Sequence, residues 1–152
     1  MMTIREDDLS SPQTLELLAI HLNGMADTSP PGHCFALDVS GLKAPGVTLW
    51  SAWDGDRIAG IGALKALGDR GGELKSMRTH PDHLRKGVGA AILEHIIAEA
   101  RRRGIVRLSL ETGSGEAFEP ALELYRRRGF ESCGAFADYV ASEFNQFMRL
   151  EL

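Results

Sequence analysis

The sequence predicts a mixed α/β fold of the α+β kind, in which helices flank a mostly antiparallel sheet. Two apolar, β-prone runs flank the tight-turn triplet Asp-Gly-Asp at residues 54–56, which is typical of an antiparallel hairpin. A second turn at residues 68–72 leads into a third run, so three strands should meander. In the second half a strand lies between two amphipathic helices, which indicates a mixed sheet.

The elements of the first half follow from periodicity and turn residues. Residues 12–25 carry leucines at helical spacing, with Ser11 available as a cap before Pro12. Residues 27–46 are rich in Ser, Pro and Gly and should form a loop with at most one short helix. The two hairpin strands are expected at residues 47–53 and 57–67.

The second half alternates strands and helices. Two glycines, Gly104 and Gly129, follow runs of helical periodicity and are good helix stops. The expected elements are a strand at 73–79, a helix at 87–103, a strand at 105–112, a helix at 117–128, and β structure from Phe130 onward with a closing strand at 144–152.

Length and composition predict one domain spanning residues 1–152 with a single core. The chain has 152 residues, of which 43% are hydrophobic and 25% charged. It contains no apolar stretch approaching the roughly 20 residues that a membrane helix requires. The first residues are charged where an export signal would be apolar, so a cytoplasmic location is expected.

Charge and metal-ligand content exclude several classes of partner. A net charge of -4 gives no general attraction to nucleic acid, and neither a nucleic acid nor a membrane partner is predicted. The two cysteines, Cys34 and Cys133, are expected to be free thiols. The five histidines show no paired spacing, so no metal site is predicted.

A glycine-containing loop follows the strand at 73–79 and opens the next helix. The first N–H groups of a helix have no partner within it and form an anion site, which Gly87 and Gly89 would leave accessible. The loop has neither the Gly-x-Gly-x-x-Gly pattern nor the P-loop pattern, so dinucleotide and P-loop nucleotide sites are excluded. On these residues alone, a simple turn remains the alternative.

With its flanks, this loop resembles a known family. The segments Met-Arg-Thr-His-Pro at 77–81 and Leu-Arg-Lys-Gly-Val-Gly-Ala at 84–90 resemble the coenzyme A loop of the GNAT superfamily of acyl-CoA-dependent N-acetyltransferases. The segment Ala-Leu-Glu-Leu-Tyr-Arg-Arg-Arg-Gly-Phe at 121–130 resembles that family's second signature. Residues 108–114 and 136–139 are further similar to its YsnE-like bacterial branch.

The resemblance implies a GNAT fold with splayed central strands and acetyl-CoA as co-substrate. Backbone groups of Met77 and Thr79 would contact the acetyl and pantetheine parts, and N–H groups of residues 85–90 would hold the pyrophosphate, with charge added by Arg85 and Lys86. The implied cofactor-binding residues are Met77, Arg78, Thr79, Arg85, Lys86, Gly87, Val88, Gly89 and Ala90.

Two positions depart from the family pattern. Leu84 stands where the family usually has Gln or Arg, so a side-chain contact to the cofactor is lost there while the backbone contacts remain. Phe118 stands where many members have Asn. Both departures are expected to alter the grip on the cofactor and to leave the fold intact.

Two catalytic residues are predicted. Tyr125 matches the family tyrosine that lies near the thioester sulfur and can protonate the departing thiolate; its alternative role is a core aromatic. Glu73 stands where several members place the base that deprotonates the amine through water. Strand alternation would put Glu73 on one face with Lys75, Met77 and Thr79. A solvated carboxylate is the alternative for Glu73, and Glu111 is the second candidate base.

The predicted function is transfer of acetyl from acetyl-CoA to a primary amine of a small molecule or protein, by direct transfer. The alternative is a non-catalytic CoA-binding sensor or interaction module, and transfer to oxygen or of a longer acyl chain stays open. His33, Trp50 and Trp53 are candidates for an acceptor pocket, although tryptophans in strands are more often core residues. A homodimer is compatible with the sequence.

Overall fold

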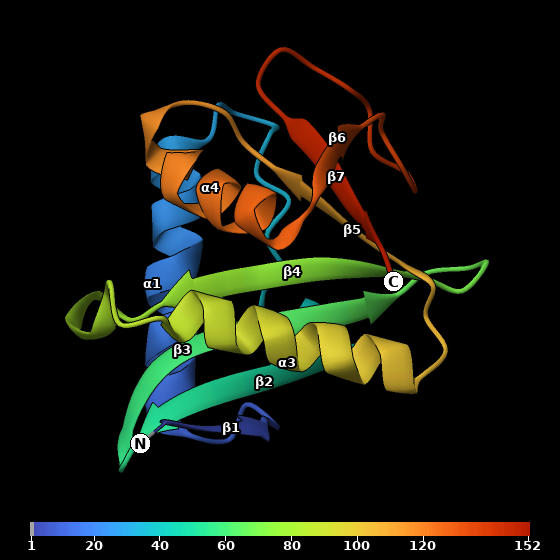
Figure 1. Ribbon diagram of the computed structural model, residues 1–152. Helices are drawn as coiled ribbons and strands as arrows, with labels where there is room; N and C mark the ends of the chain where they lie inside the picture. The colour runs from blue at the N-terminus through green and yellow to red at the C-terminus, as the bar shows by residue number, and fades with distance from the viewer. Residues whose placement is uncertain (1) are drawn as a thin grey trace.

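The computed structural model describes residues 2–152, and within this range seven strands form one sheet in the order β1-β2-β3-β4-β5-β7-β6 (Figure 1). Neighbouring strands are antiparallel except β4 and β5, which are parallel. The strands are β1 (Met2–Glu6), β2 (Val47–Asp54), β3 (Arg57–Ala66), β4 (Gly71–Thr79), β5 (Arg107–Thr112), β6 (Glu131–Cys133) and β7 (Gln146–Glu151). The predicted mixed, mostly antiparallel sheet is confirmed.

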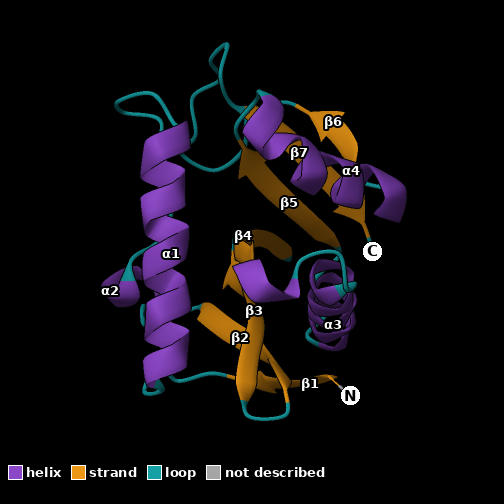
Figure 2. Cartoon of the chain, turned by 90° about the vertical axis from the view of Figure 1, so that its left-hand side faces the viewer, coloured by secondary structure: helices purple, strands orange, loops and turns teal. Residues whose placement is uncertain are grey.

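Helices cover both faces of this sheet. In Figures 1 and 2, α1 lies on one face of β2 to β4 and α3 on the other, while α4 lies beside β5 and β7. The helices are α1 (Pro12–Thr28), α2 (Val39–Leu42), α3 (Val88–Arg102) and α4 (Glu119–Arg128), with single 3-10 turns η1 (Pro81–His83) and η2 (Glu116–Phe118).

The sequence of α3 explains both its ends and its packing. Its buried residues recur at helical spacing: Val88, Ile92, Leu93, Ile96, Ile97 and Ala100. It starts after Gly87 (φ 79°) and stops before Gly104 (φ 80°), two glycines in the left-handed region. The helix therefore begins directly behind the glycine loop.

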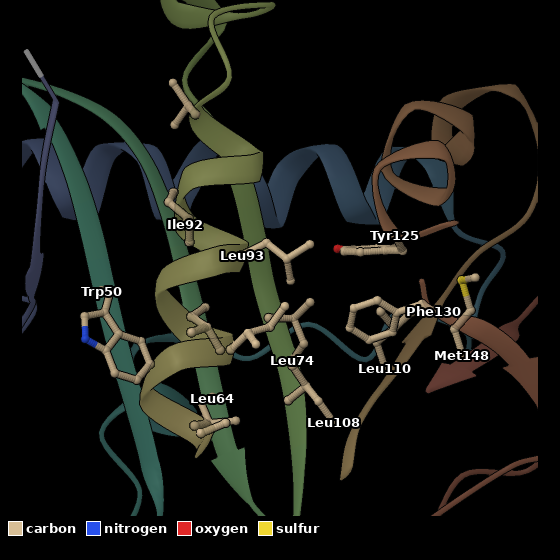
Figure 3. Close-up of a cluster of buried hydrophobic side chains, with 14 of the residues drawn as sticks. Trp50, Leu64, Leu74, Ile92, Leu93, Leu108, Leu110, Tyr125, Phe130 and Met148 are labelled. Atoms are coloured by element: carbon tan, nitrogen blue, oxygen red, sulfur yellow. The ribbon is translucent and has the colours of Figure 1, made fainter. Parts of the chain in front are cut away.

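The buried side chains form two clusters, one on each face of the sheet. The larger joins α3 and α4 to strands β2 to β5 and β7 and includes Trp50, Leu93, Leu110 and Tyr125 (Figure 3). The smaller packs α1 and α2 against β2 and β3 and includes Trp53. The two tryptophans are thus core residues.

Most predicted elements are confirmed, and two details are not. Strand β1 was absent from the predicted order, and it pairs antiparallel with β2 at the sheet edge. Ser11 occupies the N-cap of α1, yet its side chain makes no capping hydrogen bond. The short helix expected within residues 27–46 is α2. Within residues 2–152 no helix is both long and apolar enough to cross a membrane.

Candidate active site

Strands β4 and β5 separate after a short stretch of pairing. They pair only at Gly71–Arg107, Gly72–Leu108 and Glu73–Ser109, although β4 runs on to Thr79 and β5 to Thr112. A cleft of about 450 Å³ lies between the separated ends, lined by both strands and by α1, α3 and α4. Figure 2 shows β5 and β7 diverging from β4. The predicted splay of the central strands is confirmed.

A bulge in β4 decides which side chains face which side of this cleft. The β3–β4 register shifts between Ile61 and Ala63, and Ser76 opposite has a φ of 57°. After the bulge Met77 packs toward α3, since its sulfur lies 2.6 Å from where a Cβ on Gly62 would be.

Because of the bulge, Glu73 does not share a face of the sheet with Met77 and Thr79, although strand alternation predicts that it does. Thr79 follows Met77 to the α3 side, where its hydroxyl lies 3.8 Å from a Cβ placed on Gly89. Arg78 instead reaches α1, where a Cβ on Gly24 would lie 3.1 Å from its Nη2 atom. Glu73 and Lys75 therefore share the α1 side with Arg78, and simple alternation failed because one extra residue reverses the order.

The glycine loop forms one wall of the cleft mouth. Gly87 is the N-cap of α3, and a Cβ on it would meet no atom within 4 Å, so the space beside its backbone is open. The first helical bond there runs from the Ala91 N–H to the Gly87 carbonyl. The N–H groups of Val88, Gly89 and Ala90 precede it and have no acceptor within the helix. Gly89 lines the cleft, 3.3 Å separating its virtual Cβ from Leu124 of α4.

The two departures from the family pattern differ in environment. Leu84 lines the cleft and is 58% exposed, so it fills no hydrophobic contact that would explain its apolar side chain. Phe118 is buried, and its ring centroid lies 5.5 Å from that of Phe144 in an edge-on contact. It closes the space over Gly113, where a Cβ would come within 2.6 Å of its ring.

Tyr125 reaches the cleft from α4. The residue is 6% exposed, and Figure 3 shows its hydroxyl pointing from α4 toward Leu93 of α3. Burial raises its pKa above the ordinary value, so the phenol stays protonated at neutral pH. The ring also packs against Phe130, with centroids 5.6 Å apart. Tyr125 therefore combines a core ring with a proton-bearing hydroxyl at the cleft.

A buried polar network lies on the α1 side of β4. Glu73 is 2% exposed and accepts hydrogen bonds from Lys75 (3.1 Å) and from the hydroxyl of Tyr139. Lys75 also donates to the Tyr139 oxygen at 2.8 Å. Tyr139 comes from the loop between β6 and β7, so the network ties this loop to the sheet. Glu73 is thus a paired, buried carboxylate and not a solvated one.

Glu111 is the second carboxylate of this region, and it lines the cleft itself. Burial raises its pKa, and the positive charge of Lys75 offsets part of that rise while the negative charge of Glu73 adds to it. The resulting pKa is about 7. Glu111 can therefore exchange a proton near neutral pH.

Sequence reasoning missed three side chains here. Tyr139 lies in segment 136–139, where the sequence indicates only the family branch. It contacts Glu73, which is 66 residues away in the sequence, only in the folded chain. Ser76 sits in the bulge, and its buried hydroxyl has no hydrogen-bond partner among residues 2–152. His21 lies 57 residues from Arg78, whose Nε donates to its Nδ1 at 2.9 Å. In the sequence, the His21–Arg78 pair is indicated only by the single histidine in the leucine-rich helix predicted at residues 12–25.

Other candidates lie elsewhere. His33 stacks edge-on with Phe144, at 5.7 Å between centroids, outside the residues that line the cleft. Among residues 2–152, no cluster of three or more His, Cys, Asp or Glu side chains is arranged to hold a metal ion. Cys34 and Cys133 are free.

The sheet parts at its centre, and a helix that begins behind a glycine loop lies at the mouth of the cleft, which is the arrangement of an N-acetyltransferase fold. Comparison with known proteins agrees. The chain matches the Acetyltransferase (GNAT) family over residues 15–130. It is 51% identical over 151 residues to the uncharacterised N-acetyltransferase YsnE of Bacillus subtilis (strain 168), covering 99% of this chain and 100% of YsnE. The chain therefore belongs to the GNAT family.

Two further comparisons agree with this membership. The uncharacterised N-acetyltransferase YedL of Escherichia coli (strain K12) is 49% identical over 152 residues, which cover 100% of this chain and 96% of YedL. A crystal structure from Klebsiella pneumoniae, described as an acyl-CoA N-acyltransferase, superposes with a TM-score of 0.84 at 28% identity, covering 100% of this chain and 98% of the other. The predicted family, its YsnE-like branch and the fold are confirmed.

Proposed function

We propose that the protein transfers an acetyl group from acetyl-CoA directly to a primary amine of a small molecule or a protein. The observation that carries this proposal is the cleft between β4 and β5, which brings the glycine loop, the Tyr125 hydroxyl and the Glu111 carboxylate to one cavity. Membership of the GNAT family supports the reaction class. One catalytic domain over residues 1–152, in the cytoplasm, stays part of the prediction.

The residues at the cleft mouth fit an acyl-CoA. Open space beside Gly87 and the free N–H groups that follow it suit the pyrophosphate. Arg85 and Lys86 are exposed and make no ion pair among residues 2–152, so their charge is available. The unpaired strand edge at Met77 and Thr79 offers backbone groups to the pantetheine arm. The cofactor supplies the activated acetyl thioester.

The acceptor amine must lose a proton before or during attack, and Glu111 is the better-placed base. It lines the cleft, and its pKa of about 7 suits proton transfer at neutral pH. Glu73, the other candidate, already accepts hydrogen bonds from Lys75 and Tyr139. We assign Glu73 the role of holding Lys75 beside Glu111, and we assign Glu111 the proton of the amine.

Tyr125 completes the proton balance. As the new C–N bond forms and the C–S bond breaks, the sulfur leaves as a thiolate that needs a proton. A buried phenol that stays protonated can donate one, and it recovers a proton from solvent after the product leaves. No metal enters this scheme.

A non-catalytic CoA sensor or interaction module with the same fold is the competing function. Such a module needs the glycine loop but has no use for a buried phenol and a carboxylate of raised pKa in the same cleft, so these two residues favour an enzyme. Transfer to oxygen or of a longer acyl chain would use the same groups.

One experiment separates these functions. The purified protein is offered acetyl-CoA with a panel of amines, alcohols and peptides, and thiol release is followed against a no-acceptor blank. Amine-dependent release supports the proposal, and release only with alcohols would replace it with O-acetyl transfer. Tight CoA binding by calorimetry without release on any acceptor would favour the sensor. Gel filtration of the same sample tests the homodimer.

A further inference from the structure

Arg78 is a cation in the cleft without a counter-ion. Its side chain lines the cleft on the α1 side and is partly buried, yet among residues 2–152 no carboxylate lies within 4.0 Å of it. Removing a guanidinium from water without an opposite charge is costly, because nothing replaces the lost hydration. Burial lowers the pKa of Arg78, with no acid to offset it.

Among residues 2–152, the hydrogen-bond partner of the Arg78 side chain is His21, which orients the guanidinium without neutralising it. His21 is 5% exposed, and burial together with the positive charge of Arg78 lowers its pKa to about 4. The imidazole is therefore neutral at pH 7, and its Nδ1 accepts the hydrogen bond from Nε of Arg78. This contact holds the guanidinium plane, and within the described part of the chain no side chain or carbonyl accepts a hydrogen bond from Nη1 or Nη2.

The absence of a side chain at Gly24 makes room for those two nitrogens. A Cβ there would lie 3.1 Å from Nη2 and 3.5 Å from Nη1, so any larger residue would press on the guanidinium. Gly24 also lines the cleft. Helix α1 thus contributes His21, which orients Arg78, and Gly24, which leaves room for it. This environment is typical of a binding site and not of an arginine on the protein surface.

The remaining charges on this side of the cleft are arranged around Arg78. Lys75 is neutralised by Glu73. Glu111 has no ion-pair partner within 4.0 Å among residues 2–152 and lines the same cleft. Of the charged side chains that line the cleft, one cation (Arg78) and one carboxylate (Glu111) therefore have no ion-pair partner in the described chain, and they lie on the two strands that part.

We propose that Arg78 binds a carboxylate of the acceptor while Glu111 contacts its amino group and accepts the proton that this group loses on attack, so that the acceptor is a small amino acid. This inference rests on the proposed acetyl transfer and adds the substrate class. The two charges recognise opposite ends of one molecule, and a planar guanidinium fixed by His21 suits a two-point contact with a carboxylate. The α and ω amino acids share this chemistry, and the test separates them.

The test compares matched acceptors on the wild-type protein. Each α-amino acid, β-alanine and 4-aminobutyrate is paired with its carboxamide, which keeps the amine and removes only the negative charge. With acetyl-CoA saturating, we expect the preferred acid to exceed its amide by about 10- to 100-fold in kcat/KM, the range of one charge-assisted contact. Equal rates for acid and amide would overturn the inference, and this comparison needs no variant.

Variants then assign the preference to Arg78. The family resemblance implies that Arg78 binds the cofactor, whereas this inference assigns its side chain, which lies against α1, to the acceptor. Arg78→Gln should therefore remove the preference for the acid while KM for acetyl-CoA stays unchanged, and Arg78→Lys should keep part of it. Arg107→Gln is the matched control, since Arg107 pairs with Glu151 at the other end of β5. A rise in KM for acetyl-CoA with the acid preference intact would place Arg78 on the cofactor and overturn the inference.

The outcomes distinguish this inference from the proposed function. Acetylation of other amines, with every amino acid inert, would overturn the amino acid assignment and leave the acetyltransferase standing. Absence of transfer to any acceptor, with CoA binding measured separately by calorimetry, would overturn the proposed function and this inference with it.

Discussion

Tyr125 is the residue on which the proposed chemistry depends most. Tyr125→Phe keeps the ring that packs on Phe130 and removes only the hydroxyl at the cleft. We expect kcat to fall by on the order of 10² to 10⁴, the usual contribution of a positioned general acid, with little change in KM for acetyl-CoA. Steady-state and single-turnover rates on the true acceptor measure the effect.

The thermal midpoint and the CoA affinity of the same variant serve as its control. Both should stay close to wild type, because packing is kept. A wild-type single-turnover rate would reduce Tyr125 to a core aromatic.

Glu111 predicts how activity depends on pH. It must be deprotonated to accept a proton, so kcat/KM should rise with pH through about 7, the pKa of this carboxyl, and level off above it. Glu111→Gln should lower the plateau on the order of 10²-fold or more and remove this acidic limb. A pH profile of kcat/KM for both proteins measures it.

Glu131→Gln provides the control for this substitution, because it makes the same replacement of a carboxylate by a carboxamide at an exposed position of β6. Its profile should match wild type. An acidic limb that persists in Glu111→Gln would assign the titration to another group.

The individual residues differ in how far the sequence could predict them. The place of Tyr125 at the cleft could be predicted because its signature is contiguous on one helix, whereas its catalytic role stays a prediction. The partners of Glu73 and Arg78 were not, because Tyr139 and His21 meet them only through the tertiary fold. The face of Arg78 depends on one extra residue at Ser76, and a bulge has no periodic signature.

At the scale of elements, the start of α3 gives a prediction with an internal control. Gly87 and Gly104 bracket the helix with nearly equal φ of 79° and 80°, and a Cβ on either would meet nothing within 4 Å. Alanine at each should therefore cost a similar free energy of unfolding, about 1 kcal/mol. Urea unfolding of the two variants measures this.

Only the Gly87 substitution should affect the cofactor. Its Cβ would occupy the open space where the pyrophosphate is proposed to sit, so we expect a loss of CoA affinity of about 10- to 100-fold, the value of one or two charge-assisted contacts. Calorimetry on Gly87→Ala and Gly104→Ala makes the comparison. Equal CoA affinity in the two variants would remove the loop from the binding site.

Elements with strong periodicity or clear turns were predictable, and the exception is instructive. The hairpin, α3 and α4 follow from glycines and apolar spacing. Strand β1 was missed because a short edge strand buries little: Arg5 and Glu6 are exposed, and only pairing with β2 defines it. Met2 and Ile4 are half-buried and alternate with the exposed Thr3 and Arg5, but this run is too short to predict a strand.

For the whole molecule, ligand binding should join the two halves of the sheet. Only three residue pairs connect β4 to β5, so an acyl-CoA held in the cleft would contact both sides. We expect acetyl-CoA at 100 times its dissociation constant to stabilise the fold by about 2.7 kcal/mol. Amide hydrogen exchange should slow at residues 76–79 and 110–112.

The β1–β2 pair is the reference for that experiment, since it lies at the far edge of the sheet. Its exchange should change only as much as global stability does. Protection confined to β1 and β2 would contradict the proposed binding site.

The parting of β4 from β5 also bears on how the protein avoids aggregation. Each strand keeps one edge of backbone hydrogen-bonding groups without a neighbouring strand, and on an outer surface such an edge recruits other chains. Here both edges face inward across the cleft, shielded by α3 and α4. The outward edges belong to β1, which carries Arg5 and Glu6, and to the three-residue β6. The fold thus reserves unpaired backbone N–H and C=O groups for its ligand, while only short, charged strand edges are exposed to other molecules of the same protein.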